Sequence, residues 1–259
     1  MIVINCRSTP DELNLSFCPL SCYVINACSL KKRNALQLLN TEIQNFDVDI
    51  AAVTETWLNN SVASTDLSVT GYNIIRRDRI GRKGGGLCIF VKDCLITQSV
   101  AVPTTTDSKY HKMHELLYLK VEKASQVYFF MLVYHPPRPK YKPDFLLVRL
   151  SYDVEYLMDT YPNAIIYLTG NFNQLNISVL VSETGLQQVV NEATRGNSIL
   201  DLFLINRPNE VHCSVFRSCV KTDHHALLIN CADTIPSGLA PHRRCKVNFY
   251  DLRESNIDA

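Results

Sequence analysis

Several polar side chains with catalytic potential stand at the ends of apolar runs in the sequence. Asn26 ends one such run, Glu55 ends another and Tyr134 ends a third. Asp201 lies between two leucines, where an unpaired carboxylate on a buried strand would cost free energy. Because the strand ends of stacked sheets can converge at one rim, we expect these separated residues to form a single polar site.

Two further pairs of polar residues border apolar runs. Asn171 and Asn173 follow the run "AIIYLTG", and Asp223 and His224 precede the run "HALLINC". An Asp–His pair can be a carboxylate that orients an imidazole, but it is equally typical of a turn with a capping role. An isolated Glu near a strand end is most often solvated, and Asn after Gly is most often a turn residue. Taken singly, these residues leave catalysis and ordinary structure as open alternatives.

The elements that must position these residues are many strands and only two helices. The first helix is expected within 29–46, where leucines recur at helical spacing and Ser29 would be the N-cap. The second is expected over 143–162. Strand-like runs cover 22–27, 49–58, 72–78, 85–93, 115–123, 127–137, 164–170, 200–206, 212–218 and 225–231. A parallel doubly wound sheet would need a helix after nearly every strand, so the sequence predicts an α/β sandwich of two stacked sheets with helices outside.

Composition indicates a globular protein with one compact domain. The chain has 259 residues, 46% of them hydrophobic, and neither a linker-like stretch nor an internal repeat divides it. The net charge of +1 demands no nucleic-acid partner, so any phosphate-binding surface must be a local patch. The polar stretch 236–259 is expected to be a tail.

The cysteines and the apolar stretches indicate the compartment. None of the 10 cysteines forms a CxxC pair, and the start of the chain has no apolar stretch of the kind that a signal peptide needs. Reduced thiols are therefore favoured over a disulfide framework or a zinc site, and the protein is expected to be intracellular, either nuclear or cytoplasmic. No stretch approaches the roughly 20 apolar residues of a membrane span, so no membrane association is expected.

Short motifs occur in the order in which one known family carries them. They are "INACSL", "VTETWL", "GYNIIRRDRIGRKGGGLCIFVKD", "HELLYLKV", "VYHPP", "TGNFNQ", "TRGNSILDLFLIN" and "KTDHHALLI". The chain thus resembles the endonuclease/exonuclease/phosphatase superfamily, which has the fold of deoxyribonuclease I, and more narrowly the endonuclease domain of non-LTR (LINE-type) retrotransposons. The resemblance implies a four-layer α/β sandwich of two mainly antiparallel sheets flanked by helices. It places this domain at 22–235, after an N-terminal extension of residues 1–21.

The resemblance also implies a metal and a phosphate site. Family members cut phosphodiester bonds with Mg²⁺ and an in-line water. Glu55 would hold the Mg²⁺, for which Mn²⁺ is an alternative, and Asn26 would support it. His224 would face the scissile phosphate, oriented by Asp201 or Asp223, and pairing with Asp223 would raise the pKa of His224. Further contacts to phosphate oxygens or the DNA backbone would come from Asn173, Tyr134, Thr194 and Thr222.

The motif "TGNFNQ" departs from the family pattern. Family members carry Gly-Asp-Phe-Asn here, whereas this chain has Asn171 in place of the Asp. That Asp orients or deprotonates the attacking water. Asn keeps the shape and one acceptor oxygen but has no negative charge and cannot act as a base. General-base assistance is worth about 10²–10⁴ in rate, so an enzyme with impaired activity is expected.

The basic stretch "RRDRIGRKGGG" has two interpretations. In a DNA-binding protein, Arg76, Arg77, Arg79 and Arg82 would contact phosphates, and such binding weakens as salt rises. The same stretch is also typical of a solvated hairpin turn. Both alternatives stay open.

The sequence therefore predicts a metal-dependent endonuclease domain that nicks one strand of double-stranded DNA and is impaired at Asn171. In full-length relatives a reverse transcriptase domain follows and would be its partner. Two alternatives stay open. One is a catalytically inactive nucleic-acid-binding remnant, and the other is a phosphoesterase that acts on a lipid or a small phosphate.

Overall fold

The computed structural model describes residues 19–103 and 113–232. Its helices are α1 (Ala35–Phe46), α3 (Pro143–Thr160) and α4 (Ser178–Thr184), with 3-10 turns η1 (Ser64–Leu67) and η2 (Pro208–Glu210). Its strands are β1 (Cys22–Asn26), β2 (Ile50–Thr54), β3 (Tyr72–Arg77), β4 (Leu87–Lys92), β5 (Ile96–Ser99), β6 (Glu115–Lys123), β7 (Gln126–Tyr134), β8 (Ile165–Asn171), β9 (Gln187–Gln188), β10 (Asp201–Ile205), β11 (Val211–Phe216) and β12 (Ala226–Cys231).

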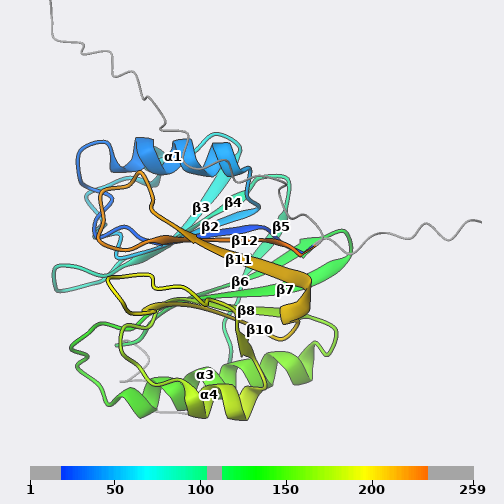
Figure 1. Cartoon of the computed structure of the whole chain (residues 1–259). Helices are drawn as coiled ribbons and strands as arrows, with labels where there is room; N and C mark the ends of the chain where they lie inside the picture. Colours follow the sequence, from blue (N-terminus) through cyan, green and yellow to red (C-terminus); the bar gives the residue numbers. More distant parts are fainter. Residues whose placement is uncertain (1–18, 104–112, 233–259) are drawn as a thin grey trace, which may run out of the picture.

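The strands form two stacked six-stranded sheets (Figure 1). The first has the order β11-β12-β1-β2-β4-β3 and the second β5-β6-β7-β8-β10-β9. Each sheet has one parallel pair among antiparallel neighbours: β1 with β2, connected through α1, and β7 with β8, connected through α3. α1 covers the outer face of the first sheet, and α3 and α4 cover that of the second. The expected four-layer, mainly antiparallel sandwich is therefore confirmed.

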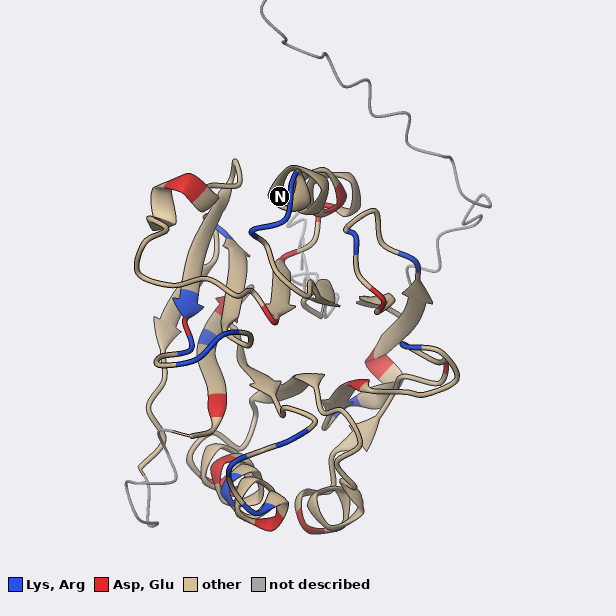
Figure 2. Cartoon of the chain, turned by 90° about the vertical axis from the view of Figure 1, so that its left-hand side faces the viewer, with Lys and Arg blue, Asp and Glu red and all other residues tan. Residues whose placement is uncertain are grey.

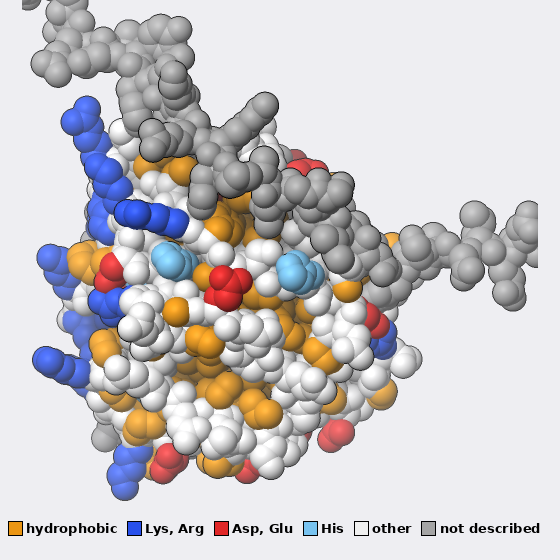
Figure 3. Space-filling model, in the orientation of Figure 1, with side chains coloured by type: hydrophobic (Ala, Val, Ile, Leu, Met, Phe, Trp, Pro, Cys, Tyr) orange, Lys and Arg blue, Asp and Glu red, His pale blue; other side chains and the backbone are white. Residues whose placement is uncertain are grey.

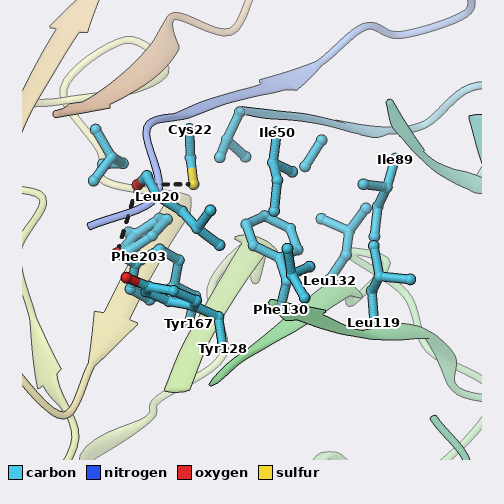
Figure 4. Close-up of a cluster of buried hydrophobic side chains, with 14 of the residues drawn as sticks. Leu20, Cys22, Ile50, Ile89, Leu119, Tyr128, Phe130, Leu132, Tyr167 and Phe203 are labelled. Atoms are coloured by element: carbon cyan, nitrogen blue, oxygen red, sulfur yellow. Dashed lines mark hydrogen bonds between the residues drawn. The ribbon is translucent and has the colours of Figure 1, made fainter. Parts of the chain in front are cut away.

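The central strands are apolar except at the ends that carry the candidate site, because both faces of each sheet are covered. All residues of β1 and β2 are buried. Between the sheets, Ile50 and Ile89 of the first sheet lie opposite Phe130 and Leu132 of the second (Figure 4). Separate apolar clusters fill the spaces beneath α1 and beneath α3 and α4. This rigid core fixes the strand ends, on which the candidate site depends.

The strand register brings the ends that carry the polar residues to one edge of the sandwich. In the first sheet, Asn26 pairs with Thr54. In the second, Asn171 pairs with both Tyr134 and Asp201. Loops gather at this edge, on the left of Figure 1, and face the viewer in Figure 2. We call this edge the loop rim; its segments are 26–34, 54–58, 78–86, 134–142, 171–177, 191–200 and 217–225.

The first helix begins later than expected, and Ser29 is not its N-cap. α1 begins after Asn34, which has a left-handed φ of 62° and makes no side-chain capping bond. Ser29 and Leu30 instead donate their backbone N–H groups to the carbonyls of Glu55 and Thr56, at 2.8 and 2.9 Å. These bonds keep the chain beside the segment that follows β2, so helical turns start only after them.

Five short elements, η1, η2, β5, β9 and α4, were not predicted from the sequence. β9 has 2 residues and α4 has 7, which is too short for a periodic apolar pattern to identify an element. β5 lies at the edge of its sheet and has no buried residue. None of the five contributes a residue of the expected site.

Other expectations concern the class of protein and the ends of the chain. Cys22, Cys28, Cys88, Cys94 and Cys213 are free thiols. No helix among those residues is long and apolar enough to cross a membrane. The expected N-terminal extension and C-terminal tail lie almost entirely outside the described residues, so the domain boundaries remain predictions.

Candidate active site

Glu55 and Asn26 meet where β1 and β2 end. The Asn26 side chain is buried and donates from Nδ2 to Glu55 Oε1 at 3.0 Å. The other carboxylate oxygen, Oε2, accepts from the indole Nε1 of Trp57 at 3.1 Å. Within residues 19–103 and 113–232, no Lys or Arg forms an ion pair with Glu55. Neutral donors therefore orient this carboxylate without neutralising its charge.

The loop that carries Glu55 has an unusual backbone conformation. Glu55 and Trp57 have left-handed φ values of 52° and 55°, which residues with a Cβ rarely adopt. This conformation makes the strand shorter than the expected 49–58. Thr56 donates its N–H to the Gly86 carbonyl at 3.2 Å, and a Cβ on Gly86 would lie only 2.5 Å from Thr56 Oγ1. The glycine thus lets two loops approach closely and hold Glu55 in place.

His224 and Asp201 form a buried imidazole–carboxylate pair. His224 Nδ1 lies 2.6 Å from Asp201 Oδ2, and the two residues are 4% and 2% exposed. A contact this short places the Nδ1 proton between them, so Asp201 accepts it and fixes the orientation of the ring. The other ring nitrogen, Nε2, lies 3.5 Å from Asn26 Nδ2. The pair is therefore joined to the Glu55 side of the site through Asn26.

Asn171 extends this buried chain of polar groups. It is fully buried, and its Nδ2 donates to Asp201 Oδ1 at 3.0 Å while its Oδ1 accepts from the Asn173 N–H at 3.2 Å. Asn171 Nδ2 also lies 3.3 Å from His224 Nδ1. Both nitrogens carry protons in this arrangement, so Asp201 is the acceptor for both. Asn171 is thus a neutral donor to the His–Asp pair, and its place holds no base.

Gly170 explains how β8 delivers Asn171 to this position. It has a φ of +133°, and a Cβ at this position would lie 2.0 Å from the carbonyl oxygen of Val133 on β7. No side chain fits there without separating the two strands. The glycine before Asn171 therefore has a steric role: it lets β8 lie directly against β7.

Tyr134 and Asn173 lie on the second-sheet side of the loop rim. Burial, then the charge of Glu55 and a hydrogen bond to it, raise the pKa of Tyr134, so its hydroxyl stays protonated. Asn173, with a left-handed φ of 50°, donates from Nδ2 to the carbonyl of His135 at 2.6 Å. Burial lowers the pKa of His135 to about 4, and its Nδ1 lies 2.9 Å from the hydroxyl of Tyr141. The amide nitrogen of Asn173 thus holds the loop that follows β7.

Asp223 does not pair with His224 as one interpretation of the sequence expected. It forms an ion pair with Arg195 at 2.5 Å, and its side chain is 53% exposed. Partial burial raises the pKa of Asp223, but the charge of Arg195 and hydrogen bonds outweigh burial and hold this pKa below its ordinary value. Because the adjacent His224 is buried, the two neighbouring residues lie in different environments, and Asp201 alone orients the imidazole.

The two threonines expected at the DNA backbone bond to the backbone of site residues instead. Thr194 is fully buried, and its Oγ1 accepts from the N–H of Asp201 at 3.1 Å. Thr222 donates from Oγ1 to the carbonyl of Asn26 at 2.8 Å and accepts from the N–H of His224 at 3.3 Å. Each hydroxyl therefore positions a member of the site from within the protein.

Most of the basic stretch is bound internally, which corrects the expectation of four phosphate contacts. The partners are Asp78 for Arg76, the carbonyl of Leu116 for Arg77, and Glu115 for Arg79. The side chains of Arg76 and Arg79 are only 13% and 11% exposed. Arg82 is exposed. Of these arginines, Arg82 alone is therefore presented for a phosphate contact, because the other guanidiniums satisfy acceptors of the fold.

Sequence reasoning missed two residues that shape the site. Trp57 is the single tryptophan of the chain and follows Glu55 by two positions, so its place in "VTETWL" could have identified it. Glu115 is buried, pairs with Arg79 and accepts from the Gly86 N–H at 2.6 Å. It links β6 to the loop at residues 84–86, here called the glycine loop, which holds Glu55. Glu115 stands in the motif "HELLYLKV", but its partners lie 29 and 36 positions away in the sequence, so the local sequence could not assign it this role.

The donor set suits a hard divalent cation held through few protein ligands. Mg²⁺ takes oxygen ligands, keeps several waters and is commonly held by one or two carboxylates. Glu55 offers a carboxylate without a cationic partner, with the amide of Asn26 beside it. Among the described residues, no group of three or more His, Cys, Asp and Glu side chains could hold a metal ion. An open site of the magnesium type fits these residues, and a closed site of the structural zinc type does not.

Known proteins resemble this chain in fold but not detectably in sequence. No family model and no curated protein sequence matches it. Among solved structures, truncated TDP2 of Caenorhabditis elegans is 15% identical over 82% of this chain and 96% of its own, with a TM-score of 0.61. The AP endonuclease LMAP of Leishmania major is 14% identical over 89% and 92%, with a TM-score of 0.59. The endonuclease domain of TRAS1, a telomere-specific non-LTR retrotransposon, is 15% identical over 82% and 98%, with a TM-score of 0.55.

These structures have the deoxyribonuclease I-like fold of the endonuclease/exonuclease/phosphatase superfamily. The chain shares that fold, and the expected deoxyribonuclease I-like sandwich is confirmed.

Proposed function

We propose that this domain is a metal-dependent phosphodiesterase that nicks DNA and is impaired by the loss of a carboxylate at Asn171. One observation supports this function most directly. A continuous chain of contacts of 2.6 to 3.5 Å joins Glu55, Asn26, His224, Asp201 and Asn171 at the meeting point of the two sheets. Two solved structures of the same fold are named as endonucleases, which favours DNA as the substrate.

Each group has a task in cleaving a phosphodiester bond. Asp201 keeps the proton of His224 on Nδ1 and so leaves Nε2 to face a phosphate oxygen. In its charged form, the imidazole donates to the oxygen on which negative charge develops. Mg²⁺ or Mn²⁺, bound at Glu55 with Asn26 beside it, would neutralise phosphate charge. The protonated hydroxyl of Tyr134 is a further neutral donor at the same edge.

The weak point of this site is activation of the attacking water. Asn171 cannot accept a proton, and both oxygens of Asp201 already accept from Asn171 and His224. General-base assistance contributes about 10²–10⁴ in rate, so the wild-type protein should cleave slowly or not measurably. The rest of the site remains suited to binding a phosphodiester and stabilising its charge.

Cleavage of supercoiled plasmid by Asn171→Asp tests the reaction class and the substrate together. We expect Mg²⁺-dependent conversion to nicked circles that stops when His224→Gln is added to the same variant. Cleavage that survives His224→Gln would contradict the assignment of the imidazole. Hydrolysis of bis(4-nitrophenyl) phosphate without plasmid nicking would instead select a phosphoesterase for small or lipid substrates. This alternative is tested because the arginines that are bound internally weaken the case for DNA.

Nucleic-acid binding without cleavage is a second candidate function, and Asn171 itself favours it. The amide satisfies the buried His–Asp pair without a metal, so the fold can persist with no catalytic use. Equal duplex affinity of wild type and Asn171→Asp, with no nicking by either, would select this candidate.

A further inference from the structure

A cavity of about 390 Å³ opens beside the candidate metal ligand. Its lining includes Trp57, Asn59 and four basic residues: Arg79, which pairs with Glu115, and Lys31, Arg82 and Lys83. None of the described Asp and Glu residues lines it. Space-filling shows Lys and Arg side chains gathered along the left edge of the molecule (Figure 3), where the loop rim lies in Figure 1. The cavity therefore combines an aromatic surface with unopposed positive charge.

Trp57 connects this cavity to the site of chemistry. Its indole Nε1 donates to Glu55 Oε2 at 3.1 Å. The ammonium of Lys83 lies 5.4 Å from the centroid of the ring. Gly84 lies against the indole, because a Cβ there would be 3.8 Å from Nε1. A ligand on the ring would thus be a direct neighbour of the carboxylate that is expected to hold the metal.

We propose that this cavity is a subsite for one unpaired nucleotide beside the scissile phosphate, an inference that rests on the proposed function. A nucleotide supplies what the cavity lacks: a phosphate for Lys83 and Arg82, and a planar base for Trp57. A phosphate that draws the Lys83 ammonium aside frees the ring face for the base. Stacking on an aromatic ring outweighs a cation–π contact at an exposed site, so the exchange is favourable.

The substrate class follows from the geometry of stacking. Bases inside a duplex are stacked on their neighbours and cannot lie on an indole ring, so the nucleotide must be unpaired. The loop that lines the cavity also presents Ile80, which is 92% exposed and lies two positions before Arg82. An exposed aliphatic side chain among basic residues can insert between base steps and unstack them. The domain is therefore expected to prefer single-stranded, frayed or flipped-out DNA over intact duplex.

The single tryptophan makes a direct test available. The wild-type protein is titrated without divalent metal, once with a single-stranded oligonucleotide and once with the same sequence as a blunt duplex. We expect the single strand to quench the tryptophan emission to a saturating endpoint, and the duplex to quench it much less. Equal quenching by both forms, or none by either, would overturn the subsite.

Variants locate the binding by the anisotropy of a labelled single strand. Trp57→Ala should weaken binding at least about fivefold, the lower range for loss of one stacked base, whereas Trp57→Phe should retain most of the affinity. Lys83→Gln should weaken it, but Lys92→Gln should not, because Lys92 pairs with exposed Asp47 at the opposite end of β4. Unchanged affinity in Trp57→Ala would overturn the proposal, as would quenching by anionic vesicles but not by DNA.

These measurements separate the subsite from the proposed function. Plasmid nicking by Asn171→Asp with no preference for single strands would overturn the subsite and leave the nuclease function standing. A saturating quench by the single strand, together with no plasmid nicking by Asn171→Asp, would support the subsite and remove the catalytic function.

Discussion

The side-chain amide of Asn171 lies about 3 Å from Asp201, and a carboxylate at the same position would lie equally close. Two buried carboxylates at that separation cannot both be ionised without a cation between them. The amide avoids this repulsion and donates to Asp201, so the His–Asp pair is satisfied in the absence of metal. The same substitution removes the group that could activate water. At the scale of single residues, Asn171 thus favours a stable metal-free protein over a fast enzyme.

The metal assignment at Glu55 can be tested by a change of charge at constant shape. Glu55→Gln should abolish Mg²⁺ binding in calorimetric titration, because the carboxylate that accepts from Asn26 is lost. It should also abolish the rise in melting temperature that a ligand specific to the folded state produces. The matched control is Asp223→Asn, which removes an exposed carboxylate that pairs with Arg195 and should leave Mg²⁺ affinity unchanged. Equal affinity in Glu55→Gln would place the metal elsewhere.

His135 should make stability depend on pH. Its pKa is about 4 in the folded protein against 6.5 ordinarily, so between these values the unfolded chain binds more protons. The free energy of unfolding therefore falls as pH falls through this window, by up to about 3 kcal/mol. His135→Gln should flatten this dependence in urea denaturation performed across the window. Parallel curves for wild type and variant would show that folding does not lower the pKa of His135.

At the scale of elements, the site depends on close approaches between backbones. β8 approaches β7 at Gly170, and the loop after β2 approaches the glycine loop at Gly86. Local sequence predicted the strands themselves: 115–123 is the span of β6, and β1, β4 and β10 lie within the expected runs. It could not predict that Glu55 leaves the strand with a positive φ, because that turn is held by bonds to residues about 30 positions away.

Gly170 provides the test at this scale. Gly170→Ala should destabilise the fold by more than about 3 kcal/mol, beyond ordinary overpacking, since the new Cβ would overlap a backbone carbonyl of β7. Gly185→Ala is the matched control. Gly185 has a φ of +69° but nothing within 4 Å of the added atom, so only the backbone cost of about 1 kcal/mol applies. Similar losses in both variants, measured by chemical denaturation, would mean that β7 and β8 are not this close.

At the scale of the whole molecule, the distribution of charge differs from what the sequence indicates. "RRDRIGRKGGG" reads as one basic patch, yet Arg79 pairs with a carboxylate 36 positions away. Sequence alone cannot separate structural arginines from exposed ones, because their partners come together only in the folded chain. For the same reason the sequence left Asp201 and Asp223 as alternatives, and the strand register selects Asp201.

Two sets of charge changes should therefore behave differently. Neutralising Arg82 and Lys83 together should weaken DNA binding and reduce the slope of log affinity against log salt. With fewer phosphate contacts, binding releases fewer counterions. Neutralising Arg76 and Arg79 should instead lower the free energy of unfolding, because their carboxylate partners would be left unpaired. A reduced slope with unchanged stability in the second pair would contradict the internal placement of these guanidiniums.

The most direct test of whether the site lacks only one charge is a rate comparison. It measures plasmid nicking in Mg²⁺ by Asn171→Asp and by wild type. The change is nearly isosteric, and the new carboxylate would lie beside Asp201 and His224. We predict a rate at least about tenfold above wild type, a conservative share of what a general base contributes. A variant as inactive as wild type would contradict this account, and so would a wild type that already nicks DNA as fast as the variant.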